Sequence, residues 1–223
     1  YTAAGVRCAG QVIFDDLAVP EDIYSACQAQ VRLMQIPALG PLAAPRCADA
    51  HKGDFGRVLV VGGGPGMPGA ARLAAEAAAR CGAGLVSVAT HADHAAVLNT
   101  GRPELMVHAV ESAGQLRPLL AGASIVVVGP GLGQSEWSRS LLETVLDSDL
   151  PLVMDADALN LLARDPLQRD NWVLTPHPGE AARLLQVSSV QIQQDRFAAA
   201  HDLQARFGGV VVLKGPGTLV AQE

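Results

Sequence analysis

Aromatic side chains are scarce in this chain of 223 residues: phenylalanine, tryptophan and tyrosine make up only 4% of it, although hydrophobic residues make up 49%. Alanine, valine and leucine must therefore form the core, as they do where helices pack on a sheet rich in valine and leucine. Long apolar runs are also missing, since none approaches the roughly 18 residues of a membrane span. The first residues lack the pattern of a signal peptide. We therefore expect no membrane partner.

Basic clusters and paired cysteines are absent as well. The net charge is -6 and no run of like charges occurs, so we expect no nucleic-acid partner, because such proteins carry a basic stripe. The charge does not exclude a phosphorylated ligand, since backbone N–H groups bind phosphate even in an acidic protein. The cysteines form no C-x-x-C pair, which indicates free thiols in a reducing compartment, here the cytoplasm. They are Cys8, Cys27, Cys47 and Cys81.

A proline-rich segment separates two parts of the chain that differ in character. Residues 35–48 contain three prolines and predict a linker. Ahead of it, within residues 1–34, the pattern predicts a strand at 11–14 and a helix at 20–34. Behind it, we expect one domain over residues 49–223. The chain begins without a methionine, so we expect it to be part of a longer protein.

From residue 57 onward, short apolar runs alternate with helical patterns, which indicates an α/β fold with a mostly parallel sheet and helices on both faces. The predicted strands are residues 58–61, 85–88, 124–128, 152–154, 172–174 and 210–213. The predicted helices are residues 68–80, 91–98, 135–146, 158–163, 179–185 and 190–207. In such a sheet the turns after the strands share one edge, where ligands bind.

Glycine-rich turns follow two of these strands. Residues 62–70 read GGGPGMPGA and lead into a helix, whose N-terminus favours a phosphate. This segment lacks the lysine and the serine or threonine of a G-x-x-x-x-G-K-[ST] loop. Residues 129–133 read GPGLG and could also allow close approach of a ligand. For both segments the alternative is a tight connection between strand and helix that binds nothing.

Two carboxylates follow the strand at 152–154. Asp155 and Asp157 are two residues apart, and they could position the waters of Mg²⁺ or a ligand hydroxyl. The alternative is that one of them caps the next helix. We expect both outcomes, with one aspartate capping the helix and the other pointing into the site.

Two further strands end in polar turns. Residues 175–180 read TPHPGE and place His177 and Glu180 at the sheet edge, although Glu180 could be only a first-turn acid that interacts with the helix dipole. Residues 214–218 read KGPGT, so that N–H groups and the Thr218 hydroxyl could hold a phosphate. The alternative for this turn is a surface lysine at the end of a strand.

Eight motifs occur in order along the second part of the chain: KGDFG at 52–56, GA at 69–70, GAGLV at 82–86, RPE at 102–104, GPGLG at 129–133, DADALN at 155–160, TPHPGE at 175–180 and KGPGT at 214–218. Together they resemble the nucleotide-dependent NAD(P)H-hydrate dehydratase family over residues 49–223. The resemblance implies a ribokinase-like three-layer sandwich. It also implies repair of NADHX and NADPHX, in the S form, by phosphoryl transfer from ADP or ATP with Mg²⁺, followed by loss of phosphate. We also expect a homo-oligomer.

The same resemblance assigns roles to residues. At the substrate, it implies contacts from Ala70, Gly129, Gly131, Asp155 and His177. At the nucleotide phosphates, it implies contacts from Lys214, Gly215, Pro216, Gly217 and Thr218. At the metal, it implies Glu180, acting on Mg²⁺ through water.

Two parts of the family pattern lie at or beyond the ends of the chain. Residues 10–20 resemble the end of the NAD(P)HX epimerase domain that is fused ahead of the dehydratase in many bacteria, so residues 1–34 are expected to be its remnant. The family's G-G-x-G-D segment, with the expected catalytic aspartate, would lie after Glu223. The dehydratase domain is therefore expected to be incomplete, and catalysis by these residues alone doubtful.

Two other functions fit parts of the pattern. A ribokinase-like kinase of a small alcohol would share the fold and the role of Glu180, but such kinases more often have asparagine where this chain has His177. A fragment that only binds nucleotide, or only supports oligomerisation, is the alternative that is not an enzyme.

Overall fold

The computed structural model describes residues 5, 8–27, 29, 31–34, 40 and 44–223. The chain divides into two units, one of residues 4–50 and one that contains residues 51–223. No helix in the described part of the chain combines the length and apolar character needed to cross a membrane.

The first unit contains a shorter helix than the sequence predicted. Helix α2 spans Glu21–Ala26 and begins where expected, after Pro20 and with two acidic residues in its first turn. It ends at Ala26 because Cys27 is extended, with φ -87° and ψ 113°. None of its residues is buried, and helices gain most of their stability from packing of an apolar face. The prediction of a helix through residue 34 was therefore wrong.

The strand predicted at residues 11–14 is also absent, since these residues form neither strand nor helix. The apolar side chains of Ile13 and Phe14 are 79% and 77% exposed. A strand needs a neighbouring chain to accept and donate its backbone hydrogen bonds. The chain instead turns just after this segment, where Asp15 Oδ1 accepts the N–H of Leu17 at 2.7 Å.

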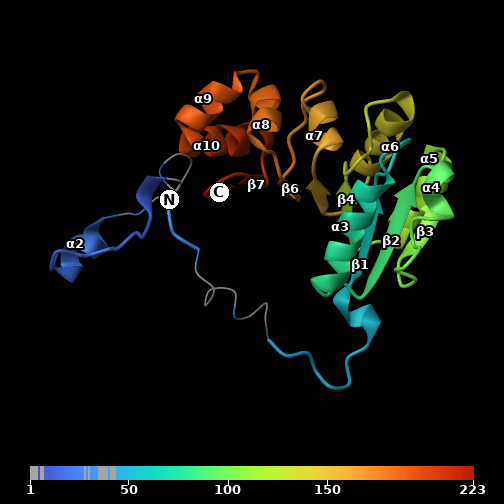
Figure 1. The fold of residues 1–223 in the computed structure, drawn as a ribbon, viewed down its shortest axis with the longest axis horizontal. Helices are drawn as coiled ribbons and strands as arrows, with labels where there is room; N and C mark the ends of the chain where they lie inside the picture. Colours follow the sequence, from blue (N-terminus) through green and yellow to red (C-terminus); the bar gives the residue numbers. More distant parts are fainter. Residues whose placement is uncertain (1–4, 6–7, 28, 30, 35–39, 41–43) are drawn as a thin grey trace. The chain divides into compact units, whose positions relative to one another are not determined.

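The second unit is built on one sheet, in which eight strands are found among the described residues, in the order β3-β2-β1-β4-β5-β6-β7-β8. The strands are β1 (Arg57–Val61), β2 (Leu85–Thr90), β3 (Met106–Ala109), β4 (Ile125–Val128), β5 (Leu152–Met154), β6 (Trp172–Leu174), β7 (Val210–Leu213) and β8 (Leu219–Ala221). All neighbours are parallel except β7 and β8. The prediction of a mostly parallel sheet is confirmed (Figure 1).

The helices agree with the sequence in most places. They are α3 (Pro68–Arg80), α4 (Ala92–Ala95), α5 (Ala113–Ala121), α6 (Glu136–Leu146), α7 (Asp157–Leu162), α8 (Pro178–Leu185), α9 (Ser189–Gln194) and α10 (Arg196–Phe207), and a 3-10 turn spans Lys52–Phe55. The helix expected at 91–98 is cut to α4, and neither β3 nor α5 was predicted.

The single helix predicted at 190–207 was wrong, because the structure has two. Asp195 lies between α9 and α10 with φ -140° and ψ 87°, outside the helical region. Its carboxylate accepts the N–H of Ala198 at 2.9 Å and so caps α10. Aspartate competes with the helical backbone in this way, which makes it a frequent cap.

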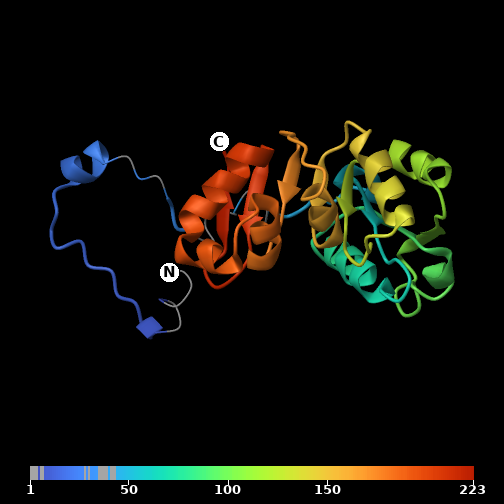
Figure 2. The same cartoon turned by 90° about the horizontal axis from the view of Figure 1, so that it is seen from above.

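The strand order places helices on both faces of the sheet. The chain runs from β1 outward to β3, then returns across β1 to β4 and continues the other way. Because crossovers between parallel strands are right-handed, the two directions put their helices on opposite faces (Figures 1 and 2). Side chains alternate accordingly: Val60 packs with α3 residues Ala71 and Ala75, whereas Leu59 and Val61 join the larger cluster under α5 to α10.

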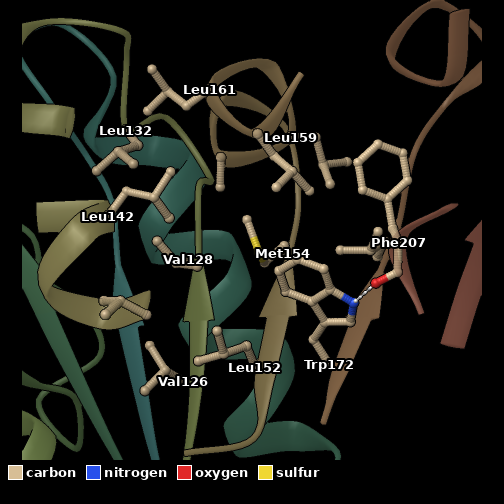
Figure 3. Packing of buried hydrophobic residues seen from close by; sticks show 14 of the residues in the cluster. Val126, Val128, Leu132, Leu142, Leu152, Met154, Leu159, Leu161, Trp172 and Phe207 are labelled. Atoms are coloured by element: carbon tan, nitrogen blue, oxygen red, sulfur yellow. Dashed lines mark hydrogen bonds between the residues drawn. The ribbon is translucent and has the colours of Figure 1, made fainter. Parts of the chain in front are cut away.

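The larger cluster contains most of the buried side chains (Figure 3). At its β6 end, the indole of Trp172 donates its N–H to the carbonyl oxygen of Phe207 at 3.1 Å. Both residues are at most 2% exposed. This bond satisfies two buried polar groups and ties the end of α10 to the sheet.

Candidate active site

The turns after β4, β5, β6 and β7 lie at one edge of the sheet, as the sequence predicted, because these four strands are neighbours and parallel. Backbone bonds join the turns directly. Asp155 donates its N–H to Val128, Thr175 donates to Met154, and Lys214 donates to Pro176 at 2.9 Å. The edge is therefore continuous from the glycines after β4 to the lysine after β7.

Asp155 is the point at which three of these turns meet. Its Oδ1 lies 2.6 Å from the ammonium of Lys214 and 2.9 Å from the hydroxyl of Thr175. The Asp155 and Lys214 side chains keep 32% and 39% of their surface exposed. The structure thus pairs the aspartate predicted at the substrate with the lysine predicted at the nucleotide. In the absence of a ligand, Asp155 can neutralise the charge of Lys214. It can also hold the Lys214 ammonium in place to bind a phosphate.

The turn that carries Asp155 is strained. Ala156 has φ 48° and ψ -113°, a conformation that non-glycine residues rarely adopt. Such a residue costs about 1–3 kcal/mol and persists where the surroundings enforce it, often at functional sites. Here the strain places Asp155 toward Lys214 and sends the next carboxylate, Asp157, in another direction.

The expectation that one aspartate caps α7 was wrong. Ala156 occupies the cap position and α7 has no side-chain cap. The carboxylate of Asp157 accepts instead from the N–H of Gly133 at 2.9 Å and from the Asn160 amide at 3.3 Å. Gly133 is far away in the sequence, and this tertiary partner outcompetes the local cap.

The glycine turns after β1 and β4 bond to each other. Gly63 donates to the carbonyl oxygen of Pro130 at 3.1 Å, and Gly64 donates to that of Gly131 at 2.6 Å. A Cβ on Gly62 would lie 2.2 Å from the oxygen of Pro130. The glycines at 62–64 thus serve close packing between two turns, and the alternative of a tight connection is favoured over phosphate binding at these N–H groups.

The residues predicted to bind substrate lie next to one another in pairs. A Cβ on Gly131 would lie 3.1 Å from the Cβ of Ala70, which is exposed at the start of α3. A Cβ on Gly129, where φ is 118°, would lie 1.9 Å from the carbonyl oxygen of Asp155. Glycine is required at both positions, so that β4 can end directly against α3 and the β5 turn.

His177 and Glu180 form a capping box at the start of α8. Glu180 Oε2 accepts the backbone N–H of His177 at 2.8 Å, and His177 Nδ1 accepts the N–H of Gly179 at 2.9 Å. Because Nδ1 accepts, the neutral ring carries its proton on Nε2, which lies 3.3 Å from Glu180 Oε1. The His177 side chain is half exposed, whereas Glu180 is buried. The Glu180 carboxylate therefore acts as a first-turn acid of α8.

No metal centre is formed among the described residues, since no group of three or more His, Cys, Asp or Glu side chains lies close enough together to hold an ion. The four cysteines are free and exposed. A surface hollow along α9, lined by Ser189, Val190, Gln193 and Gln194, contains none of the predicted site residues.

Sequence reasoning missed Arg196. This arginine begins α10 and is only 3% exposed. Its guanidinium donates to the carbonyl oxygens of Leu213 and Gly217, at 3.2 and 3.3 Å, beneath the KGPGT turn. Burial lowers its pKa from the usual value. A signal was present in the sequence, because residues 196, 199, 200, 203 and 207 form the buried stripe of α10 and Arg196 is the only charged one.

Comparison with known proteins agrees with this geometry. The family model described as NAD(P)H-hydrate dehydratase matches residues 58–223, from β1 through the KGPGT turn. The chain belongs to this family. The resemblance drawn from the eight motifs is therefore confirmed.

Individual relatives extend the match. The chain is 53% identical over all 223 residues to the bifunctional NAD(P)H-hydrate repair enzyme Nnr of Coxiella burnetii, of which it spans 46%. It is 44% identical over 186 residues to the ADP-dependent (S)-NAD(P)H-hydrate dehydratase of Neisseria meningitidis, covering 79% of this chain and 61% of that protein. The chain thus spans about half the length of the curated bifunctional relatives that it matches.

Solved structures confirm that the dehydratase fold is ribokinase-like. A ribokinase-like superfamily protein of Enterococcus faecalis superposes with a TM-score of 0.73 at 30% identity, covering 80% of this chain and 64% of that one. The ADP/ATP-dependent NAD(P)H-hydrate dehydratase of Bacillus subtilis, co-crystallised with ATP and Mg²⁺, superposes with a TM-score of 0.67 at 30% identity, with the same coverage.

Proposed function

We propose that this chain supplies the dehydratase part of an enzyme that converts the S form of NADHX and NADPHX to NADH and NADPH, with ADP as co-substrate. The observation that carries the proposal is the convergence of Asp155, Thr175 and Lys214 at the ligand-binding edge of the sheet. Membership in the dehydratase family and the ADP-dependent relative support the choice of substrate and nucleotide.

The KGPGT turn is the proposed site of the nucleotide phosphates. Lys214 supplies a positive charge, and Gly215, Pro216, Gly217 and Thr218 form the surface of the turn at the sheet edge. On the other side of Asp155, toward β4 and β1, the pairs Ala70 with Gly131 and Gly129 with Asp155 form the proposed substrate side. The half-exposed ring of His177, in the turn after β6, is proposed to contact the substrate from the opposite side of Asp155.

The proposed reaction needs a group to accept the proton of the substrate hydroxyl as the terminal phosphoryl group is transferred to that oxygen. The new ester then breaks at its C–O bond, and loss of a ring proton restores the dihydronicotinamide. Oδ1 of Asp155 already accepts hydrogen bonds from Lys214 and Thr175, so this oxygen is not free to take the hydroxyl proton in the first step. The base is therefore expected outside these residues, in the G-G-x-G-D segment of the family.

Mg²⁺ would neutralise charge on the phosphates when bound. The relative co-crystallised with ATP and Mg²⁺ supports its use. In this chain Glu180 is the proposed contact, through water, because both of its oxygens lie against His177.

The test uses the whole protein that contains these residues, mixed with NADPHX, ADP and Mg²⁺, and follows absorbance at the reduced nicotinamide band. We expect NADPH to form. Lys214→Ala should lower the rate by about 10²–10³, the usual cost of removing one donor to a developing charge, whereas removal of the exposed Arg139 on α6 should not. Phosphorylation of a small alcohol by ATP, with no NADPH formed, would favour the kinase alternative and refute the proposal.

We further propose that residues 1–34 are the end of an upstream epimerase domain and residues 35–48 its linker. The match to the Coxiella bifunctional enzyme includes these residues, because it covers all of this chain. The free, exposed cysteines support a cytoplasmic location. A homo-oligomer stays an expectation.

A further inference from the structure

Arg196 is a buried cation without an anionic partner. Among the described residues no carboxylate forms an ion pair with it, although it is only 3% exposed. The Nε atom of Arg196 is buried and finds no hydrogen-bond partner among the residues that the structure describes. Buried arginines are normally paired with a carboxylate. An unpaired one therefore needs a reason beyond packing.

Backbone carbonyl oxygens of the KGPGT turn take the place of the carboxylate. The two terminal nitrogens of Arg196 donate to the carbonyl oxygens of Leu213, at the end of β7, at 3.2 Å, of Lys214 at 3.4 Å and of Gly217 at 3.3 Å. Nη1 also donates to the side-chain oxygen of Gln193 at 3.4 Å. The bonds to the carbonyl oxygens reach around the turn from below. Gly215 closes over the guanidinium so tightly that a Cβ there would lie 2.9 Å from Nη1.

The direction of these carbonyl groups determines the direction of the next N–H groups. In a trans peptide unit the C=O and the following N–H point opposite ways. With the carbonyls of Lys214 and Gly217 turned toward Arg196, the N–H groups of Gly215 and Thr218 point away from it. Both residues are exposed. The turn therefore presents the N–H groups of Gly215 and Thr218 on its exposed side.

We propose that Arg196 is a positioning residue for the nucleotide: it holds the KGPGT turn in the shape that offers the Gly215 and Thr218 N–H groups to a diphosphate, and it adds a positive charge beneath them. This inference rests on the proposed function, because it takes the turn to be the nucleotide site. Lysine cannot replace the arginine, because one ammonium lacks the planar span that reaches all three carbonyls.

The test measures KM for ADP and KM for NADPHX separately in the whole protein, for Arg196→Lys, Arg196→Ala and the control Arg206→Ala, an exposed arginine on the same helix. We expect KM for ADP to rise about 10- to 100-fold in both Arg196 variants, the range that loss of hydrogen bonds to a charged group implies. KM for NADPHX should change by no more than about twofold, and the control should change neither. Guanidinium ion at millimolar concentration should partly restore ADP use by Arg196→Ala.

A purely structural arginine would give a different result. Its removal would change both KM values together, or lower only the thermal stability. Added guanidinium would then not lower the KM for ADP selectively. A folded Arg196→Lys variant with unchanged KM for ADP would overturn the inference, as would failure of both variants to fold. The unaltered protein decides the proposed function by itself: if it forms no NADPH, that proposal fails whatever the variants show.

Discussion

The two faces of the central sheet differ in how completely helices cover them. On the face under α5 to α10, the inward residues of β1, β4, β5, β6 and β7 are fully buried, among them Val128, Met154, Leu174 and Leu213. On the opposite face, α3 buries Val60, Val86 and Val88, but farther along the sheet the valines are only half-buried. These are Val153, Val173, Val210 and Val212.

This difference shows that strand composition and strand burial are separate properties. The strands from β4 to β7 are apolar on both faces, as is typical of a parallel sheet that is covered on both sides. Only one of these faces receives full cover from the helices described. The contribution of a valine to stability therefore depends on the face to which it points, because the hydrophobic effect scales with the apolar area removed from water.

The largest expected effect comes from the covered face. Leu174→Ala in β6 should lower the free energy of unfolding by about 2–5 kcal/mol, because it leaves a cavity in the larger cluster. Its neighbour Val173 points to the other face and is half-buried, so Val173→Ala should lower it by about 1 kcal/mol. Urea denaturation of the two variants measures the difference, and equal losses would show that the two faces are equally covered.

A smaller effect is expected at the edge of the covered face. Trp172→Phe removes the donor to the Phe207 carbonyl oxygen and leaves that buried acceptor without its partner. The expected loss is about 1–3 kcal/mol, from the cost of an unsatisfied buried group. Thermal unfolding provides the measurement. A loss within error would mean that water reaches this end of the cluster and that the cover is incomplete there too.

The smallest expected change in stability, and the only one of these three that depends on pH, comes from Glu76 in α3, on the other face of the sheet. Glu76 accepts a hydrogen bond from Arg72 at 2.8 Å, and this bond, with nearby Arg102 and Arg80, lowers the pKa of Glu76 from 4.5. A lowered pKa in the folded state stabilises the protein above pH 4.5, and that stability is lost as the pH falls through the lowered value.

Glu76→Gln should therefore lower the melting temperature at pH 6, and this effect should shrink as the pH falls below 4.5. The same series on Glu136, an exposed acid on α6, serves as the control. If Glu76→Gln left the pH dependence as it was, the ion pairs of α3 would contribute nothing to holding that helix on its face.

Most of the second unit could be predicted because its signals are local. Helix α3 has the predicted bounds, and a glycine directly follows β1 and β4. Parallel strands then require Asp155, Thr175 and Lys214 to share an edge. The predictions fail where local secondary structure depends on contacts with another segment or on a side-chain cap. Residues 11–14 have no neighbouring strand, and Asp195 interrupts a pattern that is otherwise helical.

Within the site, the sequence by itself determined which residues reach the edge, and only the tertiary structure decided what each one contacts. The pattern brought Lys214 and Asp155 to the same edge, but their pairing at 2.6 Å joins residues 59 apart in the chain. The same is true of Arg196, whose periodicity placed it on the buried stripe of α10 but did not show what it meets there. The physical reason is that periodicity specifies a direction from the backbone, whereas hydrogen bonds depend on distances of a few ångströms between segments that folding brings together.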